Sequence, residues 1–442
     1  MNNIFKAYDV RGVYPAEINE EIAYNIGRAF AVFTQAKKII IGRDMRVSGI
    51  ALVENFAQGV IDQGIDALLV GEISTDCSYF AAGKFNLPAA MFTASHNPRQ
   101  YNGIKFSLSG AVPISEDTGL KKIQQISEEK KWPAVNKKGI IEKKDILNEY
   151  IEHALSLIDK NKIKPLAVAI DAGNGMAGKM IPLVKKGLPI KILPLYFDLD
   201  GSFPHHEANP IKLENVADLI KTVQEKHADL GLAFDGDADR VFFIDELGQR
   251  VSSSLITAMI SEQILKKNPS AKIIYNVPCS KIVPETVTSC GGIPIKERVG
   301  HSFIKATMKK ENAIFGGEHS GHYYFKDNYF ADSGLIAALI VLEIISEMNQ
   351  PFSAILKPYK KYFAIEETNS EVQDKTAKMQ ELKEKFPDAQ IEELDGVTFN
   401  FPDYWFNVRP SNTEPLLRLN LEANNEALKK QKTAEILNII RS

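Results

Sequence analysis

The fold class follows from the stretch Lys37-Lys38-Ile39-Ile40-Ile41-Gly42-Arg43-Asp44-Met45-Arg46-Val47-Ser48. Its β-branched run predicts a buried strand, and the glycine and polar residues behind it predict a loop. From Ala51 to Ile61, apolar residues recur at helical spacing, and Ala67 to Val70 form another short apolar run. Strand, loop, helix and strand in this order are typical of an α/β unit.

The same order recurs twice further along the chain. Leu166 to Ile170 precede the loop Asp171-Ala172-Gly173-Asn174-Gly175, and Lys272 to Tyr275 precede Asn276-Val277-Pro278-Cys279. The C-terminal part instead has a charged helical pattern from Asp374 to Phe386, short strands near Val397 and Leu416, and a closing helix from Glu426 to Arg441. We therefore predict an α/β fold: three related α/β mixed-sheet domains plus a smaller C-terminal α+β domain, spanning residues 1–146, 147–248, 249–360 and 361–442.

Composition places the chain among ordinary globular proteins. Of its 442 residues, 44% are hydrophobic and 25% charged, with a formal net charge of −3, so bulk charge predicts no nucleic-acid and no membrane partner. Three scattered cysteines are too few for a disulfide framework or a zinc site, which favours a reducing compartment. No apolar run approaches the roughly 20 residues of a spanning helix. We predict a cytoplasmic protein, a monomer or a homodimer.

A hydroxyl nucleophile stands out in the stretch Met91 to Lys105. Ser95 lies between an apolar run that ends at Phe92 and a proline, Pro98, that a central strand cannot accommodate. Because proline also disfavours the helical region for the residue before it, Asn97, the segment is predicted to be extended or turning. Its free N–H groups suit an anionic ligand. A plain polar turn is the alternative.

A glycine pattern in the second unit competes for the functional site. Residues 173–178 match G-x-G-x-x-G after a predicted strand, and Asp198 follows at about the spacing of a dinucleotide site. A P-loop is excluded because Met180 stands where the magnesium-binding Ser or Thr is required. The pattern is either a structural strand-to-helix turn or an NAD site.

Three carboxylates follow the apolar run Leu230 to Phe234. Asp235, Asp237 and Asp239 alternate, so in an extended loop they turn to one side and repel one another unless a cation joins them. Hard oxygen ligands of this kind suit Mg²⁺. Arg240 follows directly and is placed to take a phosphate oxygen; it also occupies the position where an EF-hand requires Gly. A solvated acidic turn is the alternative.

Two further loops carry hydrogen-bonding side chains. Glu318, Ser320 and His322 alternate, so we expect one side of an extended loop to offer a surface that reads sugar hydroxyls. Near the C-terminus, a guanidinium lies just before a proline, and three short polar side chains lie between that proline and the next. This arrangement would suit a phosphate; the four residues are Arg409, Ser411, Asn412 and Thr413. A polar turn is again the alternative.

The four motifs together resemble the α-D-phosphohexomutase family, most closely its phosphomannomutase/phosphoglucomutase group. They follow the family's order of phosphoserine, magnesium, sugar-binding and phosphate-binding loops: Thr93–Pro98, Asp235–Arg240, Glu318–His322 and Arg409–Thr413. Tyr8-Asp9-Val10-Arg11-Gly12 resembles its N-terminal active-site motif, and Gly300-His301-Ser302 with Lys305 resembles another stretch near its active site. The resemblance implies a central active-site cleft between four domains. Ala238 departs mildly from the family, since many members carry Gly there.

The activity that the resemblance implies is an intramolecular phosphotransfer. A hexose 1-phosphate and a hexose 6-phosphate, of mannose or glucose, would be interconverted through phosphorylated Ser95 and a hexose 1,6-bisphosphate, which also serves as activator. Mg²⁺ would be held by Ser95, Asp235, Asp237 and Asp239. The implied catalytic groups are Ser95, Arg240 and the acid/base candidates Lys105, His301 and His322. The implied substrate-binding residues are Tyr8, Arg11, His96, Asn97, Glu318, Ser320, His322, Arg409, Ser411, Asn412 and Thr413.

Other functions stay open at this point. Glu318 and Ser320 resemble the glucose/mannose group, and phosphoglucosamine mutase is the nearest alternative. A sugar-phosphate-binding protein without catalysis is disfavoured by the presence of Ser95 and the whole carboxylate trio. An NAD-binding oxidoreductase remains the more distant alternative.

Overall fold

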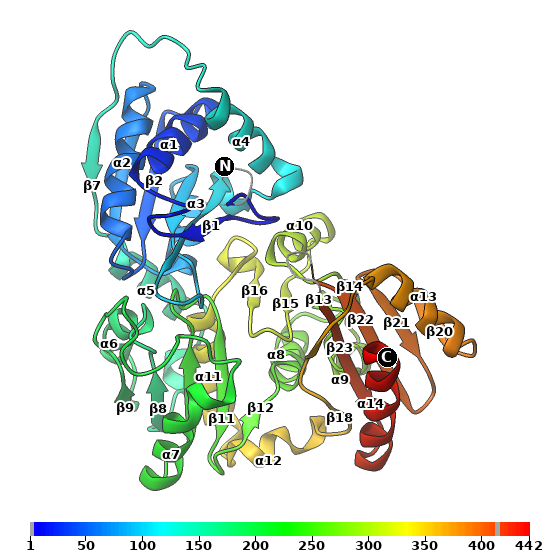
Figure 1. The fold of residues 1–442 in the computed structure, drawn as a ribbon. Helices are drawn as coiled ribbons and strands as arrows, with labels where there is room; N and C mark the ends of the chain where they lie inside the picture. The colour runs from blue at the N-terminus through cyan, green and yellow to red at the C-terminus, as the bar shows by residue number, and fades with distance from the viewer. Residues whose placement is uncertain (1–3, 412–415) are drawn as a thin grey trace.

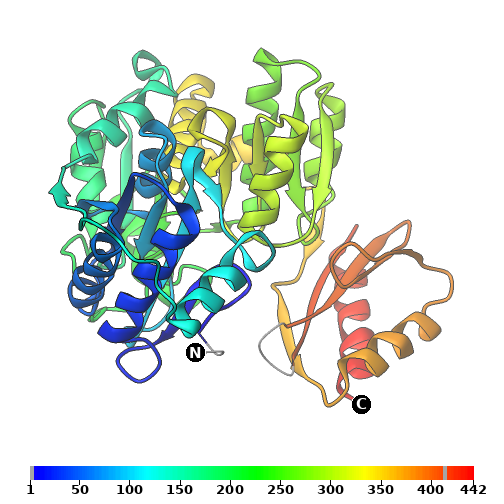
Figure 2. The same ribbon diagram turned by 90° about the horizontal axis from the view of Figure 1, so that it is seen from above.

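The computed structural model describes residues 4–411 and 416–442, and the predicted residues Asn412 and Thr413 lie outside this part. In these described residues, four β-sheets follow one another along the chain. Figure 1 shows them, with their helices, as four units from the blue N-terminal unit to the orange and red C-terminal one. In Figure 2 the C-terminal unit stands beside the other three at the end of an extended linking segment.

The first three sheets share one plan, which confirms the predicted relationship of three α/β units. Four strands lie in the order second, first, third, fourth; the first three are parallel and the fourth is antiparallel. In the first unit these strands are β2 (Lys38–Arg43), β3 (Asp66–Glu72), β4 (Ala89–Phe92) and β5 (Tyr101–Leu108). The sheet is extended by β1 (Val10–Val13), β6 (Val112–Pro113) and β7 (Ile141–Lys143), and its helices are α1 (Glu20–Thr34), α2 (Gly49–Asp62), α3 (Thr75–Lys84) and α4 (Leu120–Glu129).

The second and third units repeat this plan, each with one further antiparallel edge strand. The second contains β8 (Ala167–Asp171), β9 (Lys191–Leu195), β10 (Leu230–Phe234), β11 (Val241–Asp245) and β12 (Arg250–Val251), with α5 (Leu147–Ser156), α6 (Ala177–Lys185) and α7 (Ala217–Lys226). The third contains β13 (Lys272–Asn276), β14 (Ile293–Glu297), β15 (Phe315–Gly317), β16 (Tyr323–Phe325) and β17 (Ala331–Asp332), with α8 (Ser253–Lys267), α9 (Ile282–Ser289), α10 (His301–Glu311), α11 (Gly334–Met348) and α12 (Phe352–Leu356).

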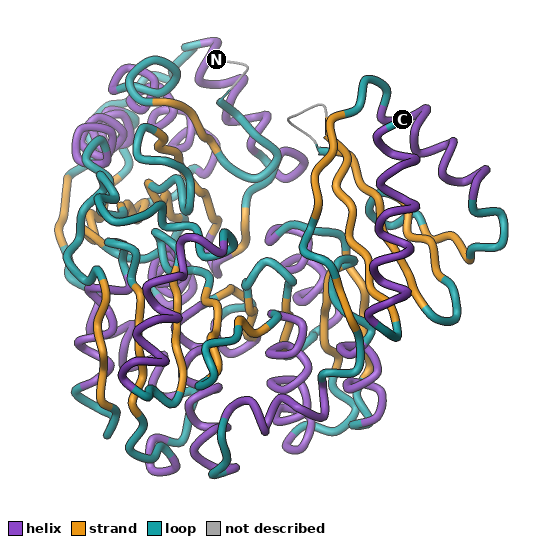
Figure 3. Tube along the Cα trace, turned by 60° about the horizontal axis from the view of Figure 1, so that its bottom comes forward, coloured by secondary structure: helices purple, strands orange, loops and turns teal. Residues whose placement is uncertain are grey.

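The fourth unit is the predicted α+β domain, and its sheet is antiparallel throughout. Its strands are β18 (Phe363–Ala364), β19 (Thr368–Glu371), β20 (Gln390–Glu392), β21 (Val397–Asn400), β22 (Tyr404–Pro410) and β23 (Leu416–Ala423). The helices are α13 (Lys375–Lys385) and α14 (Glu426–Arg441). Figure 3 shows α14 lying along the long strands. The helix starts are set by side-chain caps, since Asp374 and Asn425 accept hydrogen bonds from backbone N–H groups of the first turn.

Burial explains both the strands and the division of the molecule. Ile39, Ile40 and Ile41 are fully buried because β2 is a central strand whose two faces are both covered. One cluster of buried apolar side chains runs through all three α/β units, whereas the C-terminal unit has a cluster of its own. In the described part of the chain, no single helix is long and apolar enough to cross a membrane; α11 and the segment 352–359 pass that test only as a pair bent by 96°.

Candidate active site

The motifs of the three α/β units occupy equivalent positions in their sheets. Each forms the connection from the third strand to the antiparallel fourth strand, at residues 93–100, 235–240 and 318–322. These connections meet. Val241 N donates to the Gly321 carbonyl at 3.3 Å, and a Cβ atom at Gly236 would lie 2.6 Å from the Ser95 carbonyl oxygen. The repeated fold therefore brings three loops that are distant in sequence to one place.

Ser95 lies in the loop that follows β4, at the first of these connections. Its Oγ donates to Asp235 Oδ2 at 2.8 Å and lies 3.1 Å from His96 Nδ1. The backbone has a φ of 50°, in the left-handed region that few residues other than glycine adopt. Ser95 N donates to Thr93 Oγ1 at 2.8 Å and supports this conformation. The nucleophile predicted from the sequence thus points at the predicted carboxylate trio.

The trio converges as predicted. One oxygen from each of Asp235, Asp237 and Asp239 lies within 4.8 Å of the others, and the three residues are at most 1% exposed. The Oδ1 atoms of Asp237 and Asp239 are buried without a hydrogen-bond partner among the described residues. Buried carboxylate oxygens without partners fit a hard divalent cation. Ala238 adopts a φ of 59°, a glycine-favoured value, and the trio still converges.

Basic side chains surround the trio. Lys105 Nζ lies 3.0 Å from Asp237 Oδ2 and 2.6 Å from Asp239 Oδ2. Burial would lower the pKa of Lys105, but these two carboxylates outweigh it and hold the pKa well above its usual value. Arg240 Nε donates to Asp235 Oδ2 at 2.9 Å, while its Nη2 is buried without a hydrogen-bond partner in the described structure. Lys105 is therefore positively charged in this arrangement, which favours stabilisation of negative charge, while its predicted acid/base role stays a prediction. Arg240 keeps one donor for a ligand.

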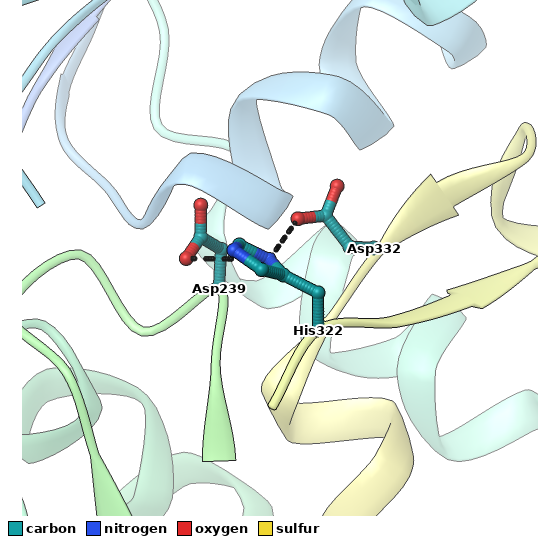
Figure 4. A group of neighbouring side chains, drawn as sticks. All are labelled: Asp239, His322 and Asp332. Atoms are coloured by element: carbon teal, nitrogen blue, oxygen red, sulfur yellow. Dashed lines mark hydrogen bonds and ion pairs between the residues drawn. The ribbon is translucent and has the colours of Figure 1, made fainter. Parts of the chain in front are cut away.

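His322 connects the trio to the third unit. Figure 4 shows its ring between two carboxylates, with Nδ1 2.7 Å from Asp332 Oδ2 and 3.9 Å from Asp239 Oδ1. Burial alone would lower the pKa of His322, but Asp239 and Asp332 outweigh it and raise the pKa. Asp332 Oδ1 also lies 2.6 Å from Lys305 Nζ. The imidazole is thus held in one orientation beside the metal loop.

His301 has a different environment at the start of α10. Its ring packs against Tyr8, with ring centroids 5.6 Å apart, and its Nδ1 is buried without a hydrogen-bond partner among the described residues. Burial, assisted by the charges of Lys305 and Lys105, lowers the pKa of His301 well below its usual value. His301 is neutral near pH 7, so it can accept a proton.

The sugar-binding motif differs from the expected extended loop. Gly321 N donates to the Glu318 carbonyl at 3.2 Å and Glu318 N to the His322 carbonyl at 2.9 Å, which closes a tight turn between β15 and β16. Gly321 permits the turn with a φ of 87°. The predicted one-sided surface was therefore wrong. Glu318 is buried against Tyr324 and Asn276, Ser320 is half-buried, and His322 points to the metal loop.

The remaining predicted residues fall into two groups. Near Ser95, Arg11 Nη1 donates to Asn97 Oδ1 at 2.7 Å. In the C-terminal unit, Arg409 ends in an ion pair with Glu367, at 2.8 Å, and Ser411 is buried behind β22. Burial opposes the ionisation of Glu367, but Arg409 outweighs it and lowers the pKa to about 2. The structure places the phosphate-loop arginine on this partner rather than on the metal loop.

The glycine-rich turn of the second unit uses its own N–H groups internally. Met176 N donates to the Gly236 carbonyl at 2.9 Å, Gly175 N to the Ala172 carbonyl at 2.7 Å, and Asn174 N to the Tyr196 carbonyl at 2.9 Å. A dinucleotide pyrophosphate would need such donors. The turn therefore supports the metal loop, and the NAD interpretation loses its basis.

Several residues of the site were missed from the sequence. Thr75 Oγ1 donates to Asp237 Oδ2 at 2.6 Å, Asp332 holds His322, and Glu367 holds Arg409. Thr75 follows the apolar run of β3, a signal that places it at a strand end without giving it a role. The partner carboxylates Asp332 and Glu367 carry no such signal, because each contact depends on how its own unit folds.

Comparison with known proteins agrees with this geometry. The chain matches models of the phosphoglucomutase/phosphomannomutase family: α/β/α domain I over residues 2–134, domain II over 148–248, domain III over 252–362 and the C-terminal domain over 367–439. It is 40% identical to a phosphomannomutase of Methanocaldococcus jannaschii, covering 99% of this chain and 97% of that protein. A phosphomannomutase of Salmonella montevideo is 38% identical over the full length of both. The crystal structure of a phosphoglucomutase/phosphomannomutase family protein from Burkholderia thailandensis superposes with a TM-score of 0.92 at 31% identity, covering 99% of this chain and 97% of that one.

Proposed function

The chain belongs to the phosphoglucomutase/phosphomannomutase family and is a phosphotransferase, and from this premise we propose that it interconverts a hexose 1-phosphate and a hexose 6-phosphate through phosphorylated Ser95. One observation carries the proposal. A serine Oγ lies 2.8 Å from Asp235, within a carboxylate trio that has buried oxygens without partners. A nucleophile and a cation site in contact are what phosphoryl transfer requires.

The residues have distinct tasks in the proposed transfer. The trio and an oxygen of phosphorylated Ser95 would hold Mg²⁺, which when bound neutralises charge on the phosphoryl group. As the sugar hydroxyl attacks, the bond from Ser95 Oγ to phosphorus breaks and the bond to the sugar oxygen forms. The hydroxyl proton passes to an imidazole, for which His301 and His322 are placed. Lys105 and Arg240 stabilise negative charge as fixed cations.

The second half of the reaction returns a phosphoryl group to Ser95 from the other end of a hexose 1,6-bisphosphate. The sugar must exchange its ends while Ser95 and the trio stay in place, so the phosphate that is not reacting needs a binding group in both orientations. Arg409, with Ser411 nearby, supplies that group from the C-terminal unit. Glu318 is the carboxylate proposed for the sugar hydroxyls, a role that requires it to exchange its present partners, Tyr324 and Asn276, for the substrate.

Mannose or glucose phosphate is the proposed substrate. Relatives that match nearly the whole chain at 36–40% identity are named phosphomannomutase or phosphohexose mutases. Phosphoglucosamine mutase is the alternative. A coupled assay with mannose 1-phosphate, glucose 1-phosphate and glucosamine 1-phosphate decides between them, because the highest kcat/KM identifies the sugar.

Replacement of the nucleophile tests the relay itself. We expect Ser95→Ala to abolish mutase activity and to remove a phosphoryl group that intact mass and peptide mapping locate on Ser95 in the active wild type. The matched control is Ser261→Ala, which removes an equally buried hydroxyl from α8. Full activity of Ser95→Ala without an added phosphoryl carrier would exclude the proposed mechanism.

A further inference from the structure

Arg46 is the largest buried polar side chain next to the Ser95 loop, and the transfer described above gives it no task. It is 1% exposed and lies between β2 and α2. Its Nη1 donates to the carbonyls of Pro98, at 3.0 Å, and Tyr101, at 2.9 Å. Its Nη2 donates to the carbonyls of Ser95, at 2.9 Å, and Asn97, at 2.7 Å. One guanidinium therefore binds three backbone carbonyls of the nucleophile loop and the carbonyl of Tyr101, where β5 begins.

The loop conformation requires such a partner. Four carbonyl oxygens turned toward one point repel each other, and the Ser95 carbonyl among them is buried, so it needs a donor from the protein. Ser95 also holds a left-handed backbone conformation, which costs free energy unless surrounding contacts enforce it. The guanidinium satisfies the carbonyls and fixes the position of the Ser95 peptide, on which the direction of Oγ depends.

Arg46 is itself held from two sides. Asp44 is fully buried, accepts from Arg46 N at 2.9 Å, and lies 3.3 Å from Arg46 Nε, so the charge is compensated. From the second unit, the ring of Phe203 lies 5.2 Å from the guanidinium carbon. A Cβ atom at Gly201 would meet Arg46 Cα at 2.7 Å, so the second unit packs directly on this residue. Arg46 thus joins the Ser95 loop to the unit that carries the carboxylate trio.

We propose that Arg46 is the positioning residue of the nucleophile: it binds the carbonyls of the Ser95 loop and aims Ser95 Oγ at the metal loop. It acts through the backbone and touches no reacting atom. The inference rests on the proposed phosphoserine mechanism. This role requires the planar guanidinium, because each of its two terminal nitrogens binds two carbonyls at fixed positions. A lysine ammonium cannot reproduce this geometry.

The test is Arg46→Lys, which keeps the positive charge and removes the planar guanidinium. The measured step is phosphorylation of Ser95 by glucose 1,6-bisphosphate in a single turnover, followed by intact mass. In this step the sugar O–P bond breaks, the Ser95 Oγ–P bond forms, and the serine proton ends on the sugar oxygen. We expect the rate to fall by about 100-fold, the size of effect that misplacement by about 1 Å produces. KM for glucose 1-phosphate should change much less than this rate, since Glu318 and Arg409, the groups proposed for the sugar and the distal phosphate, lie on other units.

Arg43→Lys is the matched control. Arg43 lies three residues earlier, pairs with Glu72 at 2.8 Å, and has a partly exposed side chain. We expect its phosphorylation rate and kcat to equal those of the wild type. Near-UV circular dichroism and the thermal midpoint of each variant separate loss of fold from loss of positioning.

Three outcomes are decisive. If Arg46→Lys is phosphorylated at the rate of the wild type, or if only its KM changes, the inference about Arg46 is overturned. The proposed function still stands in that case, because the wild-type protein is phosphorylated. Absence of phosphorylation in the wild type overturns the proposed function instead. If Arg46→Lys does not fold, Phe203→Leu decides: it removes the ring over the guanidinium and should slow phosphorylation by about two- to fivefold, as expected for a cation–π contact, and an unchanged rate overturns the inference.

Discussion

The metal loop and the Arg409 region differ in how their charged side chains are buried and paired. At the junction of the three α/β units, Asp237 and Lys105 are 0% and 8% exposed in their side chains, and each has several buried partners. In the C-terminal unit, Arg409 and Arg418 share the single carboxylate of Glu367, and their side chains are 13% and 32% exposed. The metal loop is buried and lies next to the apolar core that the three α/β units share. The Arg409 region belongs to a unit with an apolar core of its own.

This difference fits the proposed division of labour. Groups that act on the transferring phosphoryl must be fixed in advance, because reorganisation during the reaction would add to the barrier. A group that receives either end of the sugar must instead exchange one anionic partner for another. Glu367 is such a partner, since its carboxylate occupies the guanidinium that a substrate phosphate would bind. We infer that the side chains around the reacting phosphoryl group are held rigidly, whereas Arg409 can exchange Glu367 for the distal phosphate.

The largest effect is expected where the rigid region is broken. Asp237→Asn removes one charge from the trio and should lower kcat by more than about 100-fold, since even the partners of metal ligands commonly contribute about 10- to 100-fold. Activity should also require Mg²⁺ and disappear with EDTA. Steady-state kinetics over a range of Mg²⁺ concentrations measure both effects.

Asp245→Asn controls for the loss of a buried carboxylate on the same hairpin. Asp245 is fully buried at the far end of β11 and accepts from backbone N–H groups of the next turn. Its kcat should stay close to that of the wild type. Unchanged turnover of Asp237→Asn, or wild-type activity that survives EDTA, would show that the trio is only structural.

A smaller effect is expected in the exchangeable region. Arg409→Ala should weaken the transition-state interaction by about 1.5–3 kcal/mol, which lowers kcat/KM by roughly 10- to 100-fold. The loss should be similar with the 1-phosphate and the 6-phosphate, because one group serves both orientations. The maximal rate of Ser95 phosphorylation by a bisphosphate should change less than its apparent affinity, because the guanidinium holds the far end.

Arg418→Ala is the control for Arg409→Ala, since it removes the second guanidinium that pairs with Glu367, at 3.0 Å. Its effect should be clearly smaller. A large loss with one regioisomer and none with the other in Arg409→Ala would refute the shared binding group and leave the comparison between the two regions without a functional meaning.

The sequence predicted those parts of the site that lie where an apolar strand gives way to a polar loop. Ser95 and the Asp235 trio each follow a buried apolar strand, and strand ends in α/β units are where functional loops lie. The three related units were also predictable, because each repeats a buried strand and a polar loop. Arg409 was predicted in another way, from the prolines and short polar side chains around it, and its phosphate-binding role stays a prediction.

Partners that are distant in sequence were not predictable in this way. Arg46 contacts carbonyls about fifty residues away, and Glu367 contacts Arg409 across 42 residues. The alternating pattern of Glu318, Ser320 and His322 did not predict where their side chains lie. It assumes an extended backbone, whereas Gly321 permits a turn. Which carboxylate meets which cation is decided by tertiary packing, and a single sequence does not contain that information in local form.

The rigid region extends to a second buried carboxylate, Asp76, where three elements meet. Its Oδ2 accepts from Tyr150 Oη at 2.5 Å, at the start of the second unit, and from Ser333 Oγ at 2.8 Å, at the start of α11. Asp76 follows Thr75, the residue that donates to Asp237. Burial raises the pKa of Asp76 from 3.8 to about 7, although hydrogen bonds from Ser74, Tyr150 and Ser333 oppose the shift.

The smallest effect on catalysis, and one on stability, is expected from Asp76→Asn. Because the pKa is raised in the folded state, the folded protein keeps a proton between pH 4 and 7 that the unfolded chain has released, so rising pH favours unfolding in this window. The wild type should lose up to roughly 4 kcal/mol of stability from this group, complete above pH 7. Asparagine cannot titrate, so the thermal midpoint of Asp76→Asn should rise relative to the wild type from pH 4.5 to 7.5.

Glu54→Gln, which removes an exposed carboxylate from α2, should show no such trend. Parallel pH profiles for Asp76→Asn and the wild type would mean that Asp76 is ionised in the folded protein, and that the rigid region tolerates a buried negative charge beyond the metal loop.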